Sequence, residues 1–140
     1  MKARFFLDNC LSPRFARALR ELAEPQGFEI VHHGERFERN APDADWLHAL
    51  GVDGGWIIVS GDPRITRSKV ERSAWQESGL TAFFFAGGWS SKSYWKQAAD
   101  VVLVADYCAR RTARGAWVGV SYSAERHSAQ IDFSAVGRIG

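Results

Sequence analysis

Short apolar runs recur along the chain and end at polar or glycine-rich positions. Four of these runs predict β-strands, at residues 3–7, 28–32, 56–60 and 81–86. The run at 56–60 gives the strongest signal, because it is continuous and has glycines on both sides. Continuous apolar runs of this length are typical of parallel strands that are buried on both faces. We therefore expect a mainly parallel sheet.

Two helices are predicted between the first three strands. Residues 13–23 carry apolar side chains at three- and four-residue spacing, and Ser12 and Pro13 suit the N-cap and the first helical position. A shorter helix is predicted over residues 43–51, with acidic residues in its first turn and Gly51 at its end. A strand–helix–strand order of this kind favours right-handed parallel crossovers.

The segment at residues 90–111 allows two interpretations. Its apolar run at 101–104 is compatible with a fifth strand. However, no helix breaker occurs between Lys92 and Arg114, and this length is too great for one strand. We therefore favour a helix, which Ser91 could cap. Its predicted apolar face consists of Trp95, Ala98, Ala99, Val102 and Leu103.

Alternating apolar residues at 116–122 and 129–133 predict a C-terminal β-hairpin. Together the elements predict an α/β fold, namely a three-layer α/β/α sandwich with a mainly parallel central sheet and the added hairpin. The chain has 140 residues, 46% of them hydrophobic, which is enough for one core. We expect a single domain over residues 1–140, with its core at about 4–111 and the hairpin at about 116–133.

The charge of the chain is nearly balanced, with 18 Lys and Arg against 16 Asp and Glu. This balance excludes a strong global attraction to polyanions, so binding of nucleic acid would depend on local basic patches. One candidate patch consists of Arg64, Arg67, Lys69 and Arg72, and a second consists of Arg110, Arg111 and Arg114. A solvated helix face is the alternative interpretation of the first patch.

The two cysteines, Cys10 and Cys108, form no Cys-x-x-Cys pair, so neither a zinc site nor a disulfide framework is indicated. A reducing cytosol fits this pattern. The first apolar run stops well short of the roughly 7–15 residues of a signal-peptide core. No run reaches the roughly 20 apolar residues that span a bilayer. We therefore expect a cytoplasmic protein that makes no membrane contact.

Acidic residues follow two of the predicted strands. Asp8 comes directly after the first strand, and Asp62 comes two residues after the third. Ligands of a parallel sheet bind beyond the carboxyl ends of its strands, so these side chains share one edge if the two strands are neighbours. Asp43 can reach the same edge from the start of its helix, and Asp45 lies two positions further along.

Converging carboxylates repel one another, and a divalent cation relieves that repulsion. Oxygen ligands without cysteine or histidine suit Mg²⁺ (or Mn²⁺) better than zinc. Such a cation can clamp a phosphodiester and acidify a water molecule, which points to phosphodiester hydrolysis. The alternative is that these aspartates are turn formers and that Asp43 only favours the positive end of its helix. The spacing alone leaves both interpretations open.

Three blocks of the chain carry a family resemblance. In residues 5–13 a strand ends in Leu-Asp and Leu-Ser-Pro leads into a helix. In residues 42–47 an aspartate precedes an apolar helix, and in residues 57–65 a buried strand leads into Ser-x-Asp. These blocks resemble those of PIN-like domains of the VapC type, and their order and spacing agree over roughly residues 4–105.

The resemblance implies a Mg²⁺-dependent ribonuclease, often the toxin of a toxin–antitoxin pair. It assigns metal binding and catalysis to Asp8, Asp43 and Asp62. Asn9 stands where many relatives have glutamate, and the family's fourth acid has no clear counterpart after the fourth strand. Asp45 is the candidate replacement, although on a helix it points about 200° away from Asp43.

Other residues are candidates for contact with the substrate. Arg64, Arg67 and Lys69 could bind RNA phosphates. Asn9 and Ser60 could orient a water molecule or a carboxylate, with ordinary turn hydrogen bonding as the alternative for each. The histidines His32, His33 and His48 have no carboxylate or cysteine partner at metal-ligand spacing, and we interpret them as strand-end and helix-surface residues.

The expected partners are an RNA substrate and an antitoxin encoded nearby, with a homodimer as a further option. Two alternative functions remain. The first is a catalytically inactive PIN-like module that binds another protein through an aromatic surface. The second is a phosphate receiver, which would require a lysine after a later strand, and neither Lys92 nor Lys96 sits convincingly there.

Overall fold

The computed structural model describes residues 3–61, 69–85, 88–110, 116–122 and 131–138. The strands are β1 (Arg4–Leu7), β2 (Glu29–His32), β3 (Trp56–Ser60), β4 (Thr81–Phe85), β5 (Ala116–Tyr122) and β6 (Ile131–Arg138). The helices are α1 (Pro13–Ala23), α2 (Asp43–Asp53), α3 (Lys69–Ser78) and α4 (Tyr94–Arg110), with short 3₁₀ helices at Glu24–Gln26, His33–Glu35 and Trp89–Ser91.

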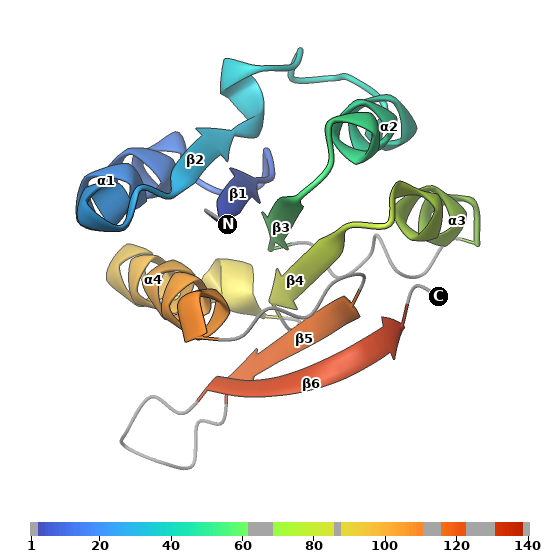
Figure 1. Ribbon diagram of the computed structural model, residues 1–140. Coiled ribbons are helices and arrows are strands. Elements are labelled where there is room, and N and C mark those ends of the chain that lie inside the picture. Colours follow the sequence, from blue (N-terminus) through green and yellow to red (C-terminus); the bar gives the residue numbers. More distant parts are fainter. Residues whose placement is uncertain (1–2, 62–68, 86–87, 111–115, 123–130, 139–140) are drawn as a thin grey trace.

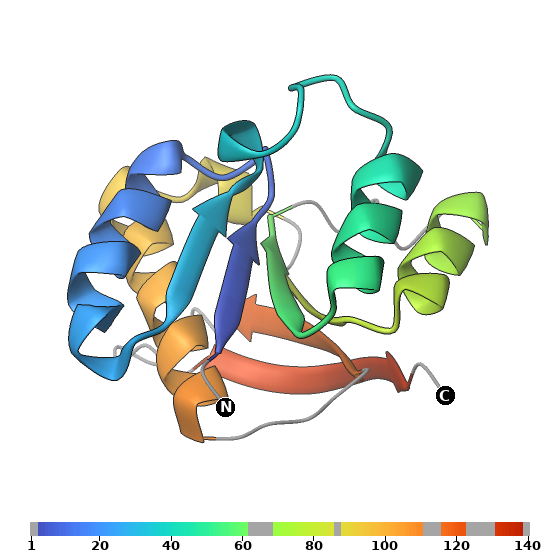
Figure 2. The ribbon, with the colours of Figure 1, turned by 45° about the horizontal axis from the view of Figure 1, so that its top comes forward.

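A six-stranded sheet runs through the molecule in the order β2-β1-β3-β4-β5-β6 (Figure 1). Strands β1 to β5 pair in parallel, and β6 is antiparallel to β5. Helices α1 and α4 cover one face, while α2 and α3 cover the other, as Figure 2 also shows. The predicted α/β/α sandwich is confirmed, and the C-terminal hairpin extends the same sheet.

Each face of the sheet has its own apolar core, because side chains alternate along the strands. In β1, Phe5 and Leu7 point towards α1 and α4, while Phe6 points towards α2 and α3. The second core is rich in aromatic rings, and Phe6 stacks on Trp46 of α2 with ring centroids 5.3 Å apart. Packing on both faces therefore holds the strands, and the residues at their ends, in fixed positions relative to the helices.

Helix α4 confirms the helical interpretation for residues 94–110 of the segment 90–111. Most of the predicted apolar face was wrong, although Ala98 does pack against the core. Trp95 is 79% exposed, and the buried face consists of Val101, Val104, Ala105 and Cys108. Both sets of residues satisfy the helical period, and contact with the sheet selects the second. The predicted cap was also wrong, because Ser93 Oγ, and not Ser91, accepts from the first-turn N–H of Lys96 at 3.4 Å.

The predicted end of helix α2 at Gly51 was wrong. The helix continues to Asp53, and Gly54 follows with a positive φ of 78°. Gly51 has a packing role instead. A Cβ atom at Gly51 would lie 3.0 Å from the carbonyl oxygen of Ser78, so glycine allows α3 to approach α2 closely. The last strand also differs from the prediction, since it spans Ile131–Arg138 and not 129–133.

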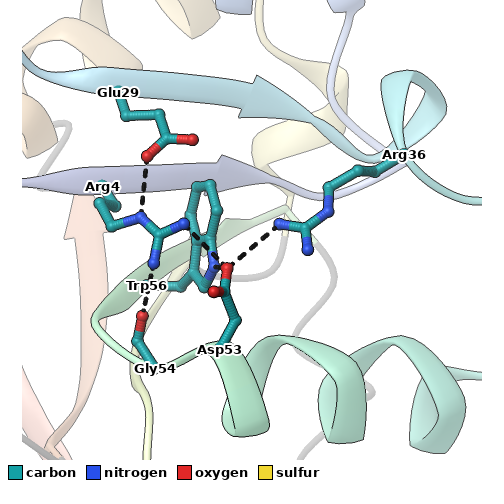
Figure 3. A network of polar contacts seen from close by, with 6 residues as sticks. All are labelled: Arg4, Glu29, Arg36, Asp53, Gly54 and Trp56. Atoms are coloured by element: carbon teal, nitrogen blue, oxygen red, sulfur yellow. Dashed lines mark hydrogen bonds and ion pairs between the residues drawn. The ribbon is translucent and has the colours of Figure 1, made fainter.

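A network of polar contacts joins the C-terminal end of α2 to the first residues of the strands (Figure 3). The Arg4 guanidinium donates to Glu29 Oε2, to Asp53 Oδ2 and to the Gly54 carbonyl, each at 2.8 Å. It also lies 4.0 Å from the ring centroid of Trp56. The 11 residues of α2 make a helix about 16 Å long. Because its last residue is anchored at the amino ends of the strands, its first residue, Asp43, lies towards their carboxyl ends.

Among the described residues, no helix is long and apolar enough to cross a membrane.

Candidate metal centre

Asp8 lies at the carboxyl end of β1, next to the end of β3. Its N–H donates to the Val59 carbonyl at 2.9 Å, so the parallel pairing continues one residue past β1. Asp8 is only 7% exposed. Ser60 Oγ donates to Asp8 Oδ2 at 2.9 Å, and the Asn9 N–H donates to Oδ1 at 2.6 Å. The structure therefore places a buried, hydrogen-bonded carboxylate at the common edge of β1 and β3.

Burial raises the pKa of the Asp8 carboxyl group, and the negative charge of Asp43 raises it further. The hydrogen bonds from Ser60 and Asn9 act in the opposite direction, because they stabilise the charged form. The carboxylate of Asp8 is thus held in a position where its charge is unfavourable. A proton or a cation would relieve this strain.

Asp43 is the first residue of α2 and lies at the same corner of the molecule. Its Oδ1 accepts a hydrogen bond from Trp46 Nε1 at 3.1 Å, which orients the carboxylate. The negative charge of Asp43 is among the causes that raise the pKa of Asp8, so these two predicted acids lie within electrostatic reach of each other. Asp45 is exposed and is not among the groups that act on Asp8. Asp43 therefore fits the predicted site better than Asp45 does.

The cluster also contains Cys10, which the sequence interpretation did not place there. Its Sγ lies 3.7 Å from Asp8 Oδ2 and from Ser60 Oγ, and it accepts from the Gly61 N–H at 3.2 Å. Burial, followed by the charge of Asp8, raises the pKa of the Cys10 thiol to about 11. The thiol is therefore protonated at neutral pH and can donate towards Asp8.

His33 lies at the end of a strand, as predicted, but its closeness to the acidic residues was not predicted. It is 1% exposed and follows β2 directly. Burial lowers its pKa, while the charges of Asp8 and Asp43 act to raise it. Leu7 of β1 pairs with His32 of β2, so the residues that follow the two strands, Asp8 and His33, leave the sheet at neighbouring positions. The signal that could have shown this is the pairing of β1 with β2.

The remaining predicted residues divide into those that the structure describes and those that it does not. Ser60 orients the Asp8 carboxylate, whereas the Asn9 side chain donates to the Arg39 carbonyl at 3.3 Å and ties two loops together. Lys69 begins α3. The predicted site residues outside the described ranges are Asp62, Arg64 and Arg67.

The chain leaves β3 at Gly61, directly before Asp62, and Trp89 fixes this position. A Cβ atom at Gly61 would lie 2.9 Å from Cζ3 of the Trp89 ring, so a side chain here would displace the ring. Trp89 is buried, stacks on Phe85 at 4.3 Å and donates to Asp100 Oδ2 at 2.9 Å. Gly61, the last described residue before Asp62, is therefore held by tight packing against Trp89.

Asp8 and Asp43 provide the type of oxygen ligand that a hard divalent cation prefers. Within the described ranges, no group of three His, Cys, Asp or Glu side chains is close enough to hold a metal ion. The predicted set also includes Asp62, which lies outside those ranges. Two carboxylates fit a hydrated Mg²⁺, because this ion usually binds through one or two carboxylates and keeps several waters.

A family model described as a PIN-like domain matches residues 3–87, which is more than half of the 140 residues. The matched segment contains β1 to β4 and includes Asp8, Asp43 and Asp62. Comparisons with curated proteins and with solved structures gave no match. The match and the α/β/α architecture confirm the PIN-like part of the resemblance, and the VapC type stays a prediction. The chain therefore belongs to the PIN-like domain family.

Proposed function

We propose that this protein is a Mg²⁺-dependent endoribonuclease that hydrolyses RNA phosphodiester bonds. Nuclease activity is frequent among PIN-like domains. The observation that carries the proposal is the buried carboxylate of Asp8, whose pKa is raised by burial and by the neighbouring charge of Asp43. Perturbed carboxyl groups of this kind occur preferentially at functional sites.

In the proposed site, Asp8 and Asp43 hold the cation, with Asp62 as the third acid. Ser60 and the Asn9 N–H keep the two oxygens of Asp8 in fixed directions. The bound cation would neutralise charge on a phosphate group and make a water molecule more acidic. Mn²⁺ would substitute for Mg²⁺, because both ions accept oxygen ligands.

The proposed RNA contacts come from the basic residues that follow Asp62, namely Arg64, Arg67 and Lys69. Their position in the chain, directly after the acid, supports contact with phosphates beside the cation. Phosphate contacts of this kind position the nucleic acid without reading its sequence. Cleavage should therefore weaken as the salt concentration rises.

We further propose that the ribonuclease is the toxin of a toxin–antitoxin pair in the cytoplasm. The support is the resemblance of the three sequence blocks to VapC-type domains. The partner would be an antitoxin encoded beside this chain. Co-expression with the product of the neighbouring reading frame should restore the growth of cells that the chain alone arrests.

The direct test of the activity is cleavage of a labelled RNA pool by the purified chain. Mg²⁺ or Mn²⁺ should support cleavage, and EDTA should stop it. Asp8→Asn and Asp43→Asn should each lower the rate by at least about 100-fold, because each removes a proposed ligand charge. Glu21→Gln, an exposed change on α1, is the control and should leave the rate unchanged.

Asp45→Asn discriminates between the two acids at the start of α2. It should have a much smaller effect than Asp43→Asn, because Asp45 is exposed and does not act on Asp8. A reversed order would assign the ligand to Asp45. Cleavage that persists in EDTA and in Asp8→Asn would contradict the ribonuclease assignment.

One observation favours the alternative of an inactive protein-binding module. Helix α4 exposes large apolar side chains at Tyr94, Trp95 and Val102. A module of this kind would bind its partner through this surface and would tolerate Asp8→Asn. Loss of partner binding in Trp95→Ser, with full binding in Asp8→Asn and no RNA cleavage by the parent chain, would favour this alternative.

A further inference from the structure

His33 carries a polar atom that the surrounding protein does not satisfy. The residue is 1% exposed, and its ring packs edge-on against the rings of Phe6 and Trp46. Its Nδ1 is buried and has no hydrogen-bond partner among the described residues. Buried polar atoms in native proteins nearly always have a partner, so this nitrogen indicates a bound water molecule or ion.

The neighbouring His32 differs from His33, because both of its ring nitrogens have hydrogen-bond partners. Its Nε2 lies 2.7 Å from the Leu11 carbonyl, and its Nδ1 accepts from the Gly34 N–H at 3.0 Å. Both nitrogens of His32 are therefore used to hold the loop after β1 and the turn after β2. His32 is a structural residue by these contacts, and none of these contacts involves the ring of His33.

His33 lies beside the candidate metal centre. Leu7 pairs with His32 at the ends of β1 and β2, and the residues that follow are Asp8 and His33, the first residue of the 3₁₀ helix His33–Glu35. The charge of Asp8 acts on His33, so the two residues lie near each other. The packing of its ring against Phe6 places it on the face that α2 covers. Trp46, which contacts the His33 ring, also donates to the Asp43 carboxylate. The ring therefore lies where the ends of β1 and β2 meet the start of α2.

The chemistry of this nitrogen suits a hydrated cation. Burial lowers the pKa of His33, which favours the neutral imidazole, and one nitrogen of a neutral imidazole has a free lone pair. Waters around Mg²⁺ can only donate hydrogen bonds outward, and Mg²⁺ retains several of them. Direct binding by His33 together with Asp8 and Asp43 is not supported, because the described residues contain no group of three ligands close enough to share an ion.

We propose that His33 is a positioning residue whose Nδ1 accepts a hydrogen bond from a water of the cation's hydration shell, next to Asp8 and Asp43. This inference rests on the proposed function, since it requires a cation at these two acids. His33 acts through that water and touches neither the cation nor the RNA. It fixes how the hydrated ion sits between β1, β2 and α2.

Calorimetric titration with Mg²⁺ and Mn²⁺ tests the inference on the whole chain. His33→Asn keeps an acceptor at the position of Nδ1, His33→Gln moves it to the position of Nε2, and His33→Phe removes it. We expect His33→Phe and His33→Gln to weaken binding about 10-fold, as is typical for residues outside the direct ligand sphere. His33→Asn should bind within about 3-fold of the parent chain, since it retains the acceptor.

The outcomes separate this inference from the proposed function. If the parent chain binds no cation, the proposed function and this inference fail together. If the parent binds a cation and Asp8→Asn does not, but His33→Phe binds as tightly as the parent, only the inference about His33 is overturned. A loss in His33→Asn equal to that in His33→Phe would also overturn it, because the Nδ1 position would then not matter.

A measurement on the unaltered chain covers the case in which a variant does not fold. In ¹⁵N spectra of the histidine rings, addition of Mg²⁺ should move the Nδ1 resonance of His33 and leave both resonances of His32 in place. Mg²⁺ is suitable because it is diamagnetic. Binding of Mg²⁺ with no change at His33 Nδ1 would overturn the inference.

Discussion

Replacing Ser60 with alanine removes the hydroxyl group that donates to Asp8 Oδ2 at 2.9 Å. Ser60 is completely buried, so bulk water is not available to replace the lost donor. A hydrogen bond to a charged group contributes about 1.5–3 kcal/mol to stability, and the smaller alanine causes no clash. In metal-free buffer at neutral pH, we therefore expect Ser60→Ala to lower the free energy of unfolding by about 2 kcal/mol.

This penalty should depend on pH, because it comes from the charge of Asp8. Burial raises the folded-state pKa of Asp8 above its unfolded value, so the folded protein binds the proton more readily. Asp8 therefore favours folding below its unfolded pKa, and this contribution is lost as the pH rises through the folded pKa. Ser60→Ala raises the folded pKa further. The loss of unfolding free energy caused by Ser60→Ala should fall to about 1 kcal/mol in acid, where Asp8 is protonated and only a neutral hydrogen bond is lost.

Urea unfolding of the parent and Ser60→Ala at neutral and acidic pH measures both quantities. Asp8→Asn provides the matched background, in which Ser60→Ala should cost about 1 kcal/mol or less at neutral pH. An equal cost in both backgrounds would refute the view that Ser60 acts through the Asp8 charge. No cost in the parent at neutral pH would refute the hydrogen bond itself.

Three further changes test the packing and the thiol chemistry around the site. Gly61→Ala should destabilise the fold by about 1–3 kcal/mol in urea unfolding, because its Cβ would meet the Trp89 ring at 2.9 Å, and an unchanged midpoint would contradict this contact. Trp46→Ala should cost about 3–5 kcal/mol because Trp46 is fully buried, whereas Trp95→Ala should leave the midpoint unchanged because Trp95 is 79% exposed. Cys10 should react with iodoacetamide about 100-fold more slowly than an ordinary thiol at pH 8, because its pKa is raised to about 11. Mass spectrometry measures the rate, and a rate equal to that of an ordinary thiol would contradict the raised pKa.

The layers of the fold could be predicted because local signals and long-range packing agree. Strand β3 was predicted to the residue, since glycines flank a continuous apolar run. The face of α4 could not be predicted, because one helix carries two apolar stripes with the same period, and only contact with the sheet selects between them. The role of Gly51 likewise depends on how closely α3 approaches α2, which is a tertiary distance.

The candidate site was predictable only where a local sequence signal marks a residue. Asp8 directly follows an apolar strand and Asp43 opens a helix, so both stand out in the sequence. His33 was correctly interpreted as a strand-end residue, but its closeness to Asp8 was not predicted, because it depends on β2 being the neighbour of β1. The roles assigned to Asp62, Arg64 and Arg67 remain predictions, because these residues lie outside the described ranges.

The central claim is that Asp8 and Asp43 share one divalent cation. A titration with Mn²⁺ followed by electron paramagnetic resonance tests it most directly, because free and bound Mn²⁺ give distinct signals. We expect one tightly bound Mn²⁺ ion per chain, displaced by excess Mg²⁺ and lost in both Asp8→Asn and Asp43→Asn. Tight binding that persists in both variants would contradict it.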